Sequence, residues 1–221
     1  YLNSILYTVL GTTINIVMTM LCAYPLARNT LPFRGFLMFL FAFTMYFSGG
    51  LIPSYLLVRN LNIMNTIWAL LLPGAISVYN MIIARTFLQT NIPNELLEAA
   101  QIDGCNDFKF LFSVILPLSK AIIAVLTLYY AVAHWNAWFN AMIYLNDRNK
   151  YPLQLVLRDI LIVNQLNSDN IADPELAQQL MKTAELLKYS LIVIATVPMM
   201  IIYPFVQKYF VRGVMIGSLK G

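Results

Sequence analysis

Aromatic and amide side chains gather in one short stretch of the sequence, between residues 129 and 144. This stretch contains Tyr129, Tyr130, His134, Trp135, Asn136, Trp138, Phe139, Asn140 and Tyr144. Aromatic rings stack on the apolar faces of a ligand, and amides hydrogen-bond its hydroxyl groups. On a helix, Tyr130, His134 and Trp138 would share one stripe. The pattern therefore favours a binding site for a hydroxyl-rich ligand such as a sugar.

The same composition is also typical of a membrane interface, where Trp and Tyr accumulate without touching a ligand. Asn136 and Asn140 favour the binding site slightly, because amides are costly when they face lipid. His134 is the only histidine of the chain, and a single histidine also serves as a hydrogen-bonded packing residue. With two candidates from other segments, the predicted ligand-binding residues are Tyr46, Asn80, Tyr130, His134, Trp135, Asn136, Trp138 and Asn140.

A second informative segment is 91–120, which reads NIPNELLEAAQIDGCNDFKFLFSVILPLSK. Pro93 suits the first position of a helix, and Gly104 suits the residue just beyond its end, where glycine adopts the left-handed conformation. Asn106 then caps a second helix, and Leu116-Pro117 ends it. Two short helices that present small and aromatic residues are more than a connection requires, so the segment predicts a docking element for a partner protein.

The helices that hold these residues are expected to lie in a membrane. Of the 221 residues, 60% are hydrophobic and 11% are charged, whereas a soluble domain has about 25% charged residues. A bilayer core requires about 20 helical residues, and the segments of about this length without Asp, Glu, Lys or Arg are 1–27, 36–58, 60–84, 121–146 and 189–207. Apolar and polar residues do not alternate in them as in barrel strands. The predicted fold class is all-α, a polytopic transmembrane helical bundle.

Positive charge on short loops predicts the orientation, because cytoplasmic loops carry an excess of Lys and Arg. The first loop and the C-terminal tail contain basic residues without acids, namely Arg28, Arg34, Lys208, Arg212 and Lys220. Both are expected in the cytoplasm. Alternating spans then leave 59–65 and 147–188 outside and 85–120 inside. Arg85, at the inner end of its span, is expected to extend its side chain to the interface.

The outer loop 147–188 contains a helix-like pattern that begins at Pro152. Its apolar stripe, suited to packing over the bundle or lying on the membrane surface, consists of Leu153, Val156, Leu157, Ile160 and Leu161. A second short helix is expected from Asp173-Pro174-Glu175, which are residue types of a helix start. The loop is either a docking platform for an extracytoplasmic partner or a simple connection.

The segment 91–120 resembles the EAA loop of permeases from ATP-binding-cassette (ABC) importers. Glu98-Ala99-Ala100, three residues, Gly104, nine residues and Val114-Ile115-Leu116-Pro117 follow that pattern, in which Val114 stands where the family has Ile. The resemblance extends from Asn3-Ser4 to the tail YFVRGVMIGSLKG. It is greatest to carbohydrate permeases related to the maltose system, and among them to the subgroup for oligosaccharides or polysaccharide fragments, because of HWNAWFNAMIYLNDRNKYPLQ at 134–154.

This resemblance implies a type I ABC importer permease fold, with residues 1–221 as one transmembrane permease domain that lacks an N-terminal span. It implies a second homologous permease, two ATPase subunits that bind ATP and Mg, and an extracytoplasmic solute-binding protein that delivers a carbohydrate. No cofactor is expected in this chain. The location would be the bacterial cytoplasmic (inner) membrane. In the segment 91–120, the residues implied in ATPase coupling are Glu98, Ala99, Ala100, Asp103, Gly104, Leu116 and Pro117.

Other functions fit the sequence less well. The alternative is an ion-coupled secondary transporter of small polar solutes, which usually needs carboxylates inside the membrane, yet all ten acids lie outside the charge-free segments. An enzyme is not expected, because the single histidine has no nearby acid or paired acidic motif with which to form a catalytic site. The sequence also has no GxxxxGK[ST] loop, so this chain is not expected to hydrolyse ATP. Cys22 and Cys105 lack the spacing of a metal site, and the dispersed basic residues do not predict nucleic-acid binding.

Overall fold

The computed structural model describes residues 1–169, 183 and 186–201, and in this part of the chain it contains helices and no strands. The first helices are α1 (Leu2–Ala27), α2 (Arg34–Tyr46), α3 (Leu51–Asn60), α4 (Trp68–Leu71), α5 (Val78–Asn91) and α6 (Asn94–Ile102). They are followed by α7 (Asp107–Phe110), a π-helical turn (Leu111–Ile115), α8 (Leu116–Leu118), α9 (Lys120–Trp135), α10 (Phe139–Tyr144), a 3-10 turn (Arg148–Lys150), α11 (Leu153–Asp169) and an apolar helix (Leu186–Ile201). The predicted all-α class is confirmed.

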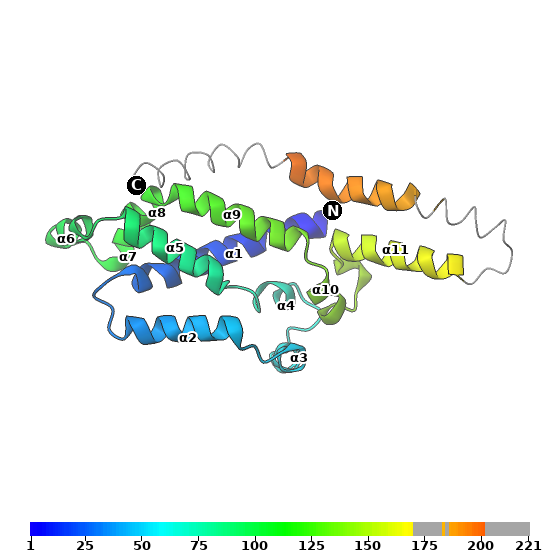
Figure 1. Ribbon diagram of the computed structural model, residues 1–221, viewed down its shortest axis with the longest axis horizontal. Coiled ribbons are helices and arrows are strands. Elements are labelled where there is room, and N and C mark those ends of the chain that lie inside the picture. Colours follow the sequence, from blue (N-terminus) through cyan, green and yellow to red (C-terminus); the bar gives the residue numbers. More distant parts are fainter. Residues whose placement is uncertain (170–182, 184–185, 202–221) are drawn as a thin grey trace.

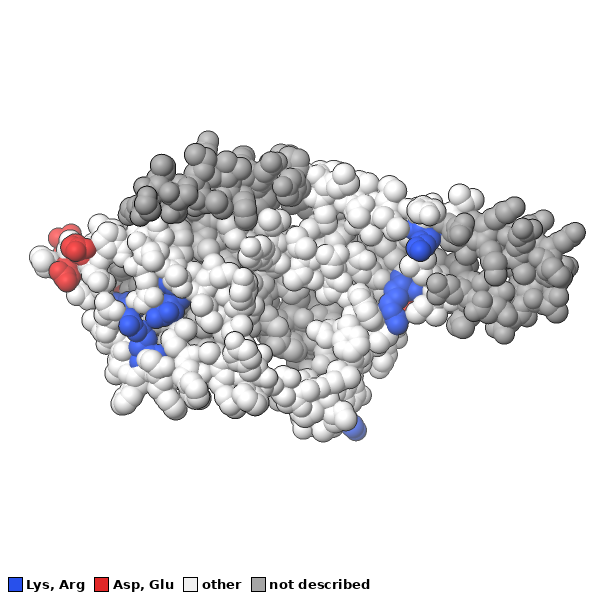
Figure 2. Space-filling view, viewed as in Figure 1, with Lys and Arg blue, Asp and Glu red and all other residues white. Residues whose placement is uncertain are grey.

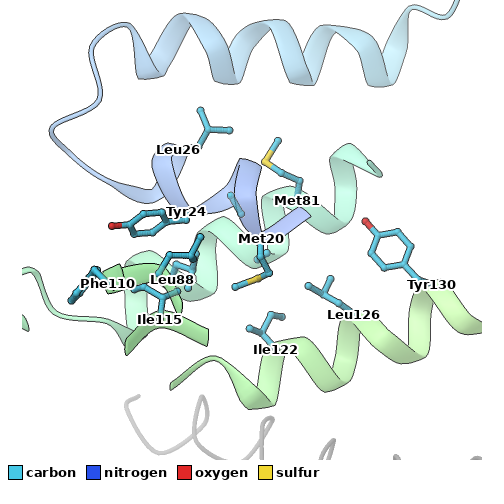
Figure 3. Packing of buried hydrophobic residues seen from close by; sticks show 13 residues of the cluster. Met20, Tyr24, Leu26, Met81, Leu88, Phe110, Ile115, Ile122, Leu126 and Tyr130 are labelled. Atoms are coloured by element: carbon cyan, nitrogen blue, oxygen red, sulfur yellow. The ribbon is translucent and has the colours of Figure 1, made fainter. Parts of the chain in front are cut away.

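Helix α1 lies at the centre of the bundle, packed along α9 and α5 (Figure 1). Figure 3 shows Met20 of α1 pointing toward Ile122 of α9, while the ring of Tyr24 lies on the side of Phe110 and Leu88 within the same apolar cluster. Helices in a membrane associate through such close packing, because lipid is as apolar as the side chains themselves. Any displacement of α1 must therefore involve both of its neighbours.

The end of α1 is completed by side chains of α5. The last carbonyl groups of a helix have no partner within the helix. Arg85 Nε donates to the Leu26 carbonyl at 3.0 Å, and Gln89 Nε2 donates to the Ala27 carbonyl at 3.2 Å. A cation at this position also suits the negative end of the helix dipole. Arg85 thus binds the end of α1.

Three of the charge-free segments are not continuous helices, and one of them, 121–146, divides into α9 and α10 at residues 136–138. The segment 36–58 divides at residues 47–50 into α2 and α3, which meet at 111° and are joined by Gly50 with φ of 85°. The segment 60–84 divides into α4 and α5 around Pro73 and Gly74. Glycine and proline interrupt helices however apolar their surroundings are, so these segments are not single straight helices.

Among the described residues, α1 alone is long and apolar enough to cross a membrane by itself. Up to three spans result if two bent pairs are counted as one span each, Arg34–Asn60 and Asp107–Trp135, the second with a bend of 81°. The helix Leu186–Ile201 is apolar but shorter. On the face shown in Figure 2, charged side chains lie toward the two ends of the molecule and the surface between them is uncharged, as a bilayer requires.

The loops separate into two groups at opposite ends of the bundle. At one end Arg28, just after α1, pairs with Asp107, so the first loop meets the segment 91–120. At the other end Tyr7 Oη donates to the Lys150 carbonyl at 2.7 Å, and Lys150 Nζ donates to the Asn65 carbonyl at 2.9 Å. The loops expected on one side of the membrane are thus gathered at one end.

Helix α11 begins directly after Pro152, as the sequence predicted. Leu153 and Leu157 are buried against Trp135 and Leu191, with Leu161 beside them. The other two residues of the predicted stripe, Val156 and Ile160, are exposed. The side of α11 that carries Leu153, Leu157 and Leu161 therefore packs against the bundle, and the neighbouring side with Val156 and Ile160 does not. The second helix expected from Asp173-Pro174-Glu175 and the basic C-terminal tail lie outside the described residues.

Candidate functional site

A cavity of about 300 Å³ lies between α1, α5, α9 and the turn that joins α4 to α5. Four residues predicted from the sequence line it: Asn80, Tyr130, His134 and Asn140. The structure adds further polar side chains to its wall, namely Tyr7, Asn15, Ser77 and Tyr129. The lining contains amides, hydroxyls and one imidazole but no Asp, Glu, Lys or Arg. Such a wall can exchange hydrogen bonds with the hydroxyl groups of a ligand.

Asn15 joins three parts of the chain at this cavity. Its side chain is almost fully buried, its Nδ2 donates to the Gly74 carbonyl at 2.6 Å, and its Oδ1 lies 2.6 Å from His134 Nε2. A carbonyl can only accept, so the amide nitrogen must face Gly74 and the amide oxygen must face the histidine. His134 therefore carries its proton on Nε2 and donates it to Asn15.

Tyr130 forms a second junction between the same parts of the chain. Its hydroxyl lies 2.7 Å from Thr19 Oγ1 of α1 and accepts from the backbone N–H of Ser77 at 3.3 Å. The Ser77 hydroxyl in turn accepts from the backbone N–H of Asn80 at the start of α5. Buried polar groups require such partners. The two junctions hold the turn at 72–77 against α1 and α9, so this turn forms a shaped wall of the cavity.

The other predicted residues do not line this cavity. Tyr46 ends α2 and is 83% exposed. Trp135 is buried beside α11 and donates its Nε1–H to the Ala195 carbonyl at 3.0 Å. Asn136 donates to the Val132 carbonyl of its own helix, and Trp138 lies under the guanidinium of Arg158 at 4.5 Å. The predicted stripe fails at Trp138 because α9 ends at Trp135.

Sequence reasoning missed Asn15, Tyr7 and Ser77. The signal for Asn15 was present, because an amide inside a charge-free segment is costly unless it finds a partner. Asn136 and Asn140 carry the same signal in their own segment. Tyr7 and Ser77 carried no comparable signal. Their place at the cavity depends on contacts between helices that are distant in the sequence.

The segment 91–120 folds as two short helices around Gly104. Gly104 has φ of 72°, its N–H donates to the Gln101 carbonyl at 3.0 Å, and the Cys105 N–H donates to the Ala100 carbonyl at 2.9 Å. This pair of bonds is the Schellman motif. Asn106 then caps α7 by accepting from the Lys109 N–H at 2.8 Å. The predicted glycine stop and Asn106 cap are confirmed, while Pro93 lies one position earlier, as the N-cap.

Helix α6 presents most of its surface to the outside. Figure 2 shows acidic side chains gathered at the tip that α6 forms. Glu98 and Ala99 are exposed, whereas Ala100 packs inward with Leu97. Asp103 caps the helix and is exposed, and at the far end of the loop Leu116 is half-buried while Pro117 is exposed.

Large apolar side chains lie beside these acids. Ile102 is 87% exposed, Phe108 71% and Phe112 61%. An exposed apolar patch with a polar rim marks a protein-binding surface. The geometry therefore agrees with a docking element, in which Ala100 packs against the rest of the loop and Glu98 and Ala99 are exposed.

Comparisons with known proteins match nearly the whole chain. Residues 1–216 match the family described as binding-protein-dependent transport system inner membrane component. The chain is 44% identical to the polygalacturonan/rhamnogalacturonan transport system permease protein YtcP of Bacillus subtilis (strain 168), over 100% of this chain and 76% of that protein. It is also 44% identical to the protein LplC of the same organism, over 99% of this chain and 72% of that protein.

A solved structure has the same fold. It is the crystal structure of a bacterial ABC transporter involved in the import of the acidic polysaccharide alginate. The TM-score is 0.81 at 34% sequence identity, and the match covers 95% of this chain and 74% of that one. The predicted type I permease fold is thereby confirmed.

Proposed function

Because this chain belongs to the family of binding-protein-dependent transport system inner membrane components, we propose that it is a membrane-spanning subunit of an ATP-driven importer that carries an oligosaccharide. The family consists of transport components, not of enzymes. We assign ATP hydrolysis to two separate ATPase subunits, which bind ATP and Mg. The further proposed partners are a second homologous permease and an extracytoplasmic solute-binding protein, in the cytoplasmic membrane of a bacterium with the C-terminus inside.

The observation that carries the substrate class is the polar, uncharged wall of the cavity. Asn15, Tyr130 and His134 hold the wall in shape through hydrogen bonds among themselves and to the turn, while Tyr129 and Asn140 are exposed at the cavity, whose lining contains no charged side chain. A carbohydrate presents hydroxyl groups at many angles, which amide and hydroxyl side chains satisfy. The relatives named for polygalacturonan and rhamnogalacturonan and the alginate importer support a substrate derived from polysaccharides.

The exposed loop supports the proposal that this chain transports the substrate while separate subunits hydrolyse ATP. Helix α6 offers Glu98, Ala99 and the apolar Ile102 to a partner, which suits the cleft of an ATPase subunit. Helix α2 buries none of its residues within this chain, so its apolar surface is left for lipid or for the second permease. Closure of the two ATPase subunits would push the docking loops of the two permeases together. The cavity would then change from being open on one side of the membrane to being open on the other.

Uptake into proteoliposomes tests the proposal. The complete transporter would be reconstituted with its binding protein outside and ATP inside, and a panel of labelled oligosaccharides would be offered. We expect uptake of one glycan class that requires ATP and is unchanged when ion gradients are collapsed. Uptake that follows an imposed proton or sodium gradient without ATP would instead support the ion-coupled transporter and contradict this proposal.

Gly11 provides a test of the cavity wall in the same assay. A Cβ atom at this position would lie 2.5 Å from His134 Cε1 and Nε2, so the Gly11→Ala variant must displace the ring and break its hydrogen bond to Asn15. The loss of one such bond corresponds to about a fivefold lower uptake. Gly35→Ala is the matched control, because nothing lies within 4 Å of a Cβ there. Equal uptake by both variants would show that His134 does not shape the site.

A further inference from the structure

One ion pair joins the docking loop to the central helix. Arg28 follows directly on α1, and its guanidinium donates to the Asp107 carboxylate in the first turn of α7. The same group donates to Tyr24 Oη at 3.0 Å and lies 5.4 Å from the centre of that ring. The Tyr24 ring contacts Phe110 of α7 at 6.4 Å between centroids. The loop is thus attached to α1 by charge and by aromatic packing at one point.

The two side chains of this pair differ in their exposure to water. The Arg28 side chain is 13% exposed, whereas the Asp107 side chain is 63% exposed. Loss of the carboxylate would leave the buried guanidinium without its anion, which costs more than a surface pair contributes. Within the described residues, the other salt bridge joins Lys150 to Asp147 in a single loop. Arg28 and Asp107 therefore form the ionic connection between distant segments.

The central helix extends from this connection to the cavity. Helix α1 is continuous from Leu2 to Ala27, and it carries both Asn15 and Tyr7 on the cavity wall. Pro25 lies in the last turn of this helix, but Tyr24 precedes it and contacts both Arg28 and Phe110, so the loop is attached to α1 on the cavity side of the proline. Small shifts of packed helices are an established form of conformational change. A displacement of α7 that is transmitted to Arg28 must therefore reach Asn15.

We propose that Arg28 is a positioning residue that transmits movement of the docking loop to α1, and through α1 to the cavity. Asp107 receives the displacement of the loop, and Tyr24 holds the guanidinium in line with the helix. This inference rests on the proposed function, because it assigns a route between ATP hydrolysis outside the membrane and transport within it.

The test measures uptake and ATP hydrolysis in the same proteoliposomes. For Arg28→Gln and for Asp107→Asn we expect about tenfold less substrate transported per ATP hydrolysed, as for loss of a charged hydrogen bond. The double variant is expected to be no worse than either single variant, since both remove the same interaction. Arg28→Lys keeps the charge and is expected to recover part of the ratio.

Arg59→Gln is the control, because Arg59 is an exposed arginine of α3 without a carboxylate partner among the described residues. It should transport as the unmodified protein does. Independent, multiplying losses in the double variant, or normal ratios in both single variants, would overturn the inference. A transporter whose unmodified form shows no ATP-dependent uptake would contradict the proposed function itself. The two failures are therefore distinct.

Discussion

Replacement of Gly104 with proline is expected to abolish ATP-dependent uptake while the permease still inserts in the membrane. Gly104 has φ of 72°, which proline cannot adopt, and its N–H donates to the Gln101 carbonyl, which proline cannot replace. A cost of about 3 kcal/mol or more lowers the population of the native turn by about 100-fold. The measurement is uptake and ATP hydrolysis by the reconstituted complex, with the amount of permease in the membrane determined in parallel.

Gly104→Asn is the matched variant for this position. Asparagine tolerates the left-handed conformation better than other side chains and keeps the backbone N–H. We expect it to retain most of the uptake. Full uptake by Gly104→Pro would mean that the turn between α6 and α7 has no part in coupling. A loss of equal size in both variants would point to the side chain's volume instead of the backbone conformation.

The second large effect is expected for Asn15→Leu. Leucine has a similar size but leaves the Gly74 carbonyl and His134 Nε2 without a partner in a buried site. An unsatisfied buried group costs about 1–3 kcal/mol, so uptake should fall by about tenfold or more. Substrate-stimulated ATP hydrolysis should fall with it, because the defect lies at the cavity and not at the docking loop.

The Asn136→Leu variant distinguishes the cavity seen in the structure from the ligand-binding residues predicted from the sequence. The sequence alone favoured Asn136 as a ligand-binding residue, whereas in the structure its side chain donates to Val132 of its own helix. We expect a smaller loss of uptake than for Asn15→Leu. The reverse order, with the larger loss at Asn136, would move the binding site away from the cavity between α1, α5 and α9.

Local chemistry could be predicted from the sequence, and long-range placement could not. The Gly104 stop, the Asn106 cap and the start of α11 after Pro152 depend on a few neighbouring residues, and all three are in the structure. The positions of the breaks at 47–50, 72–77 and 136–138 do not follow from the lack of charge, because a segment that is apolar enough to enter lipid need not be one continuous helix.

The candidate site shows the same limit. Tyr130 and His134 were found because they lie one turn apart on a single helix. Trp135 has the same residue type as a ligand-stacking aromatic, yet it is buried against Leu153 and Leu191. Aromatic residues pack between helices as well as they stack on ligands. Which of the two a given ring does depends on α11, whose position the sequence does not give.

The end of α1 also bears on how the protein is made. Arg85 and Gln89 of α5 supply the hydrogen bonds to the Leu26 and Ala27 carbonyls, and a ribosome completes α1 well before it synthesises α5. Unsatisfied carbonyl groups are not tolerated in hydrocarbon. Newly inserted α1 must therefore keep this end at the water interface until α5 arrives beside it, so that the pairing of these two helices follows insertion and completes the nascent bundle.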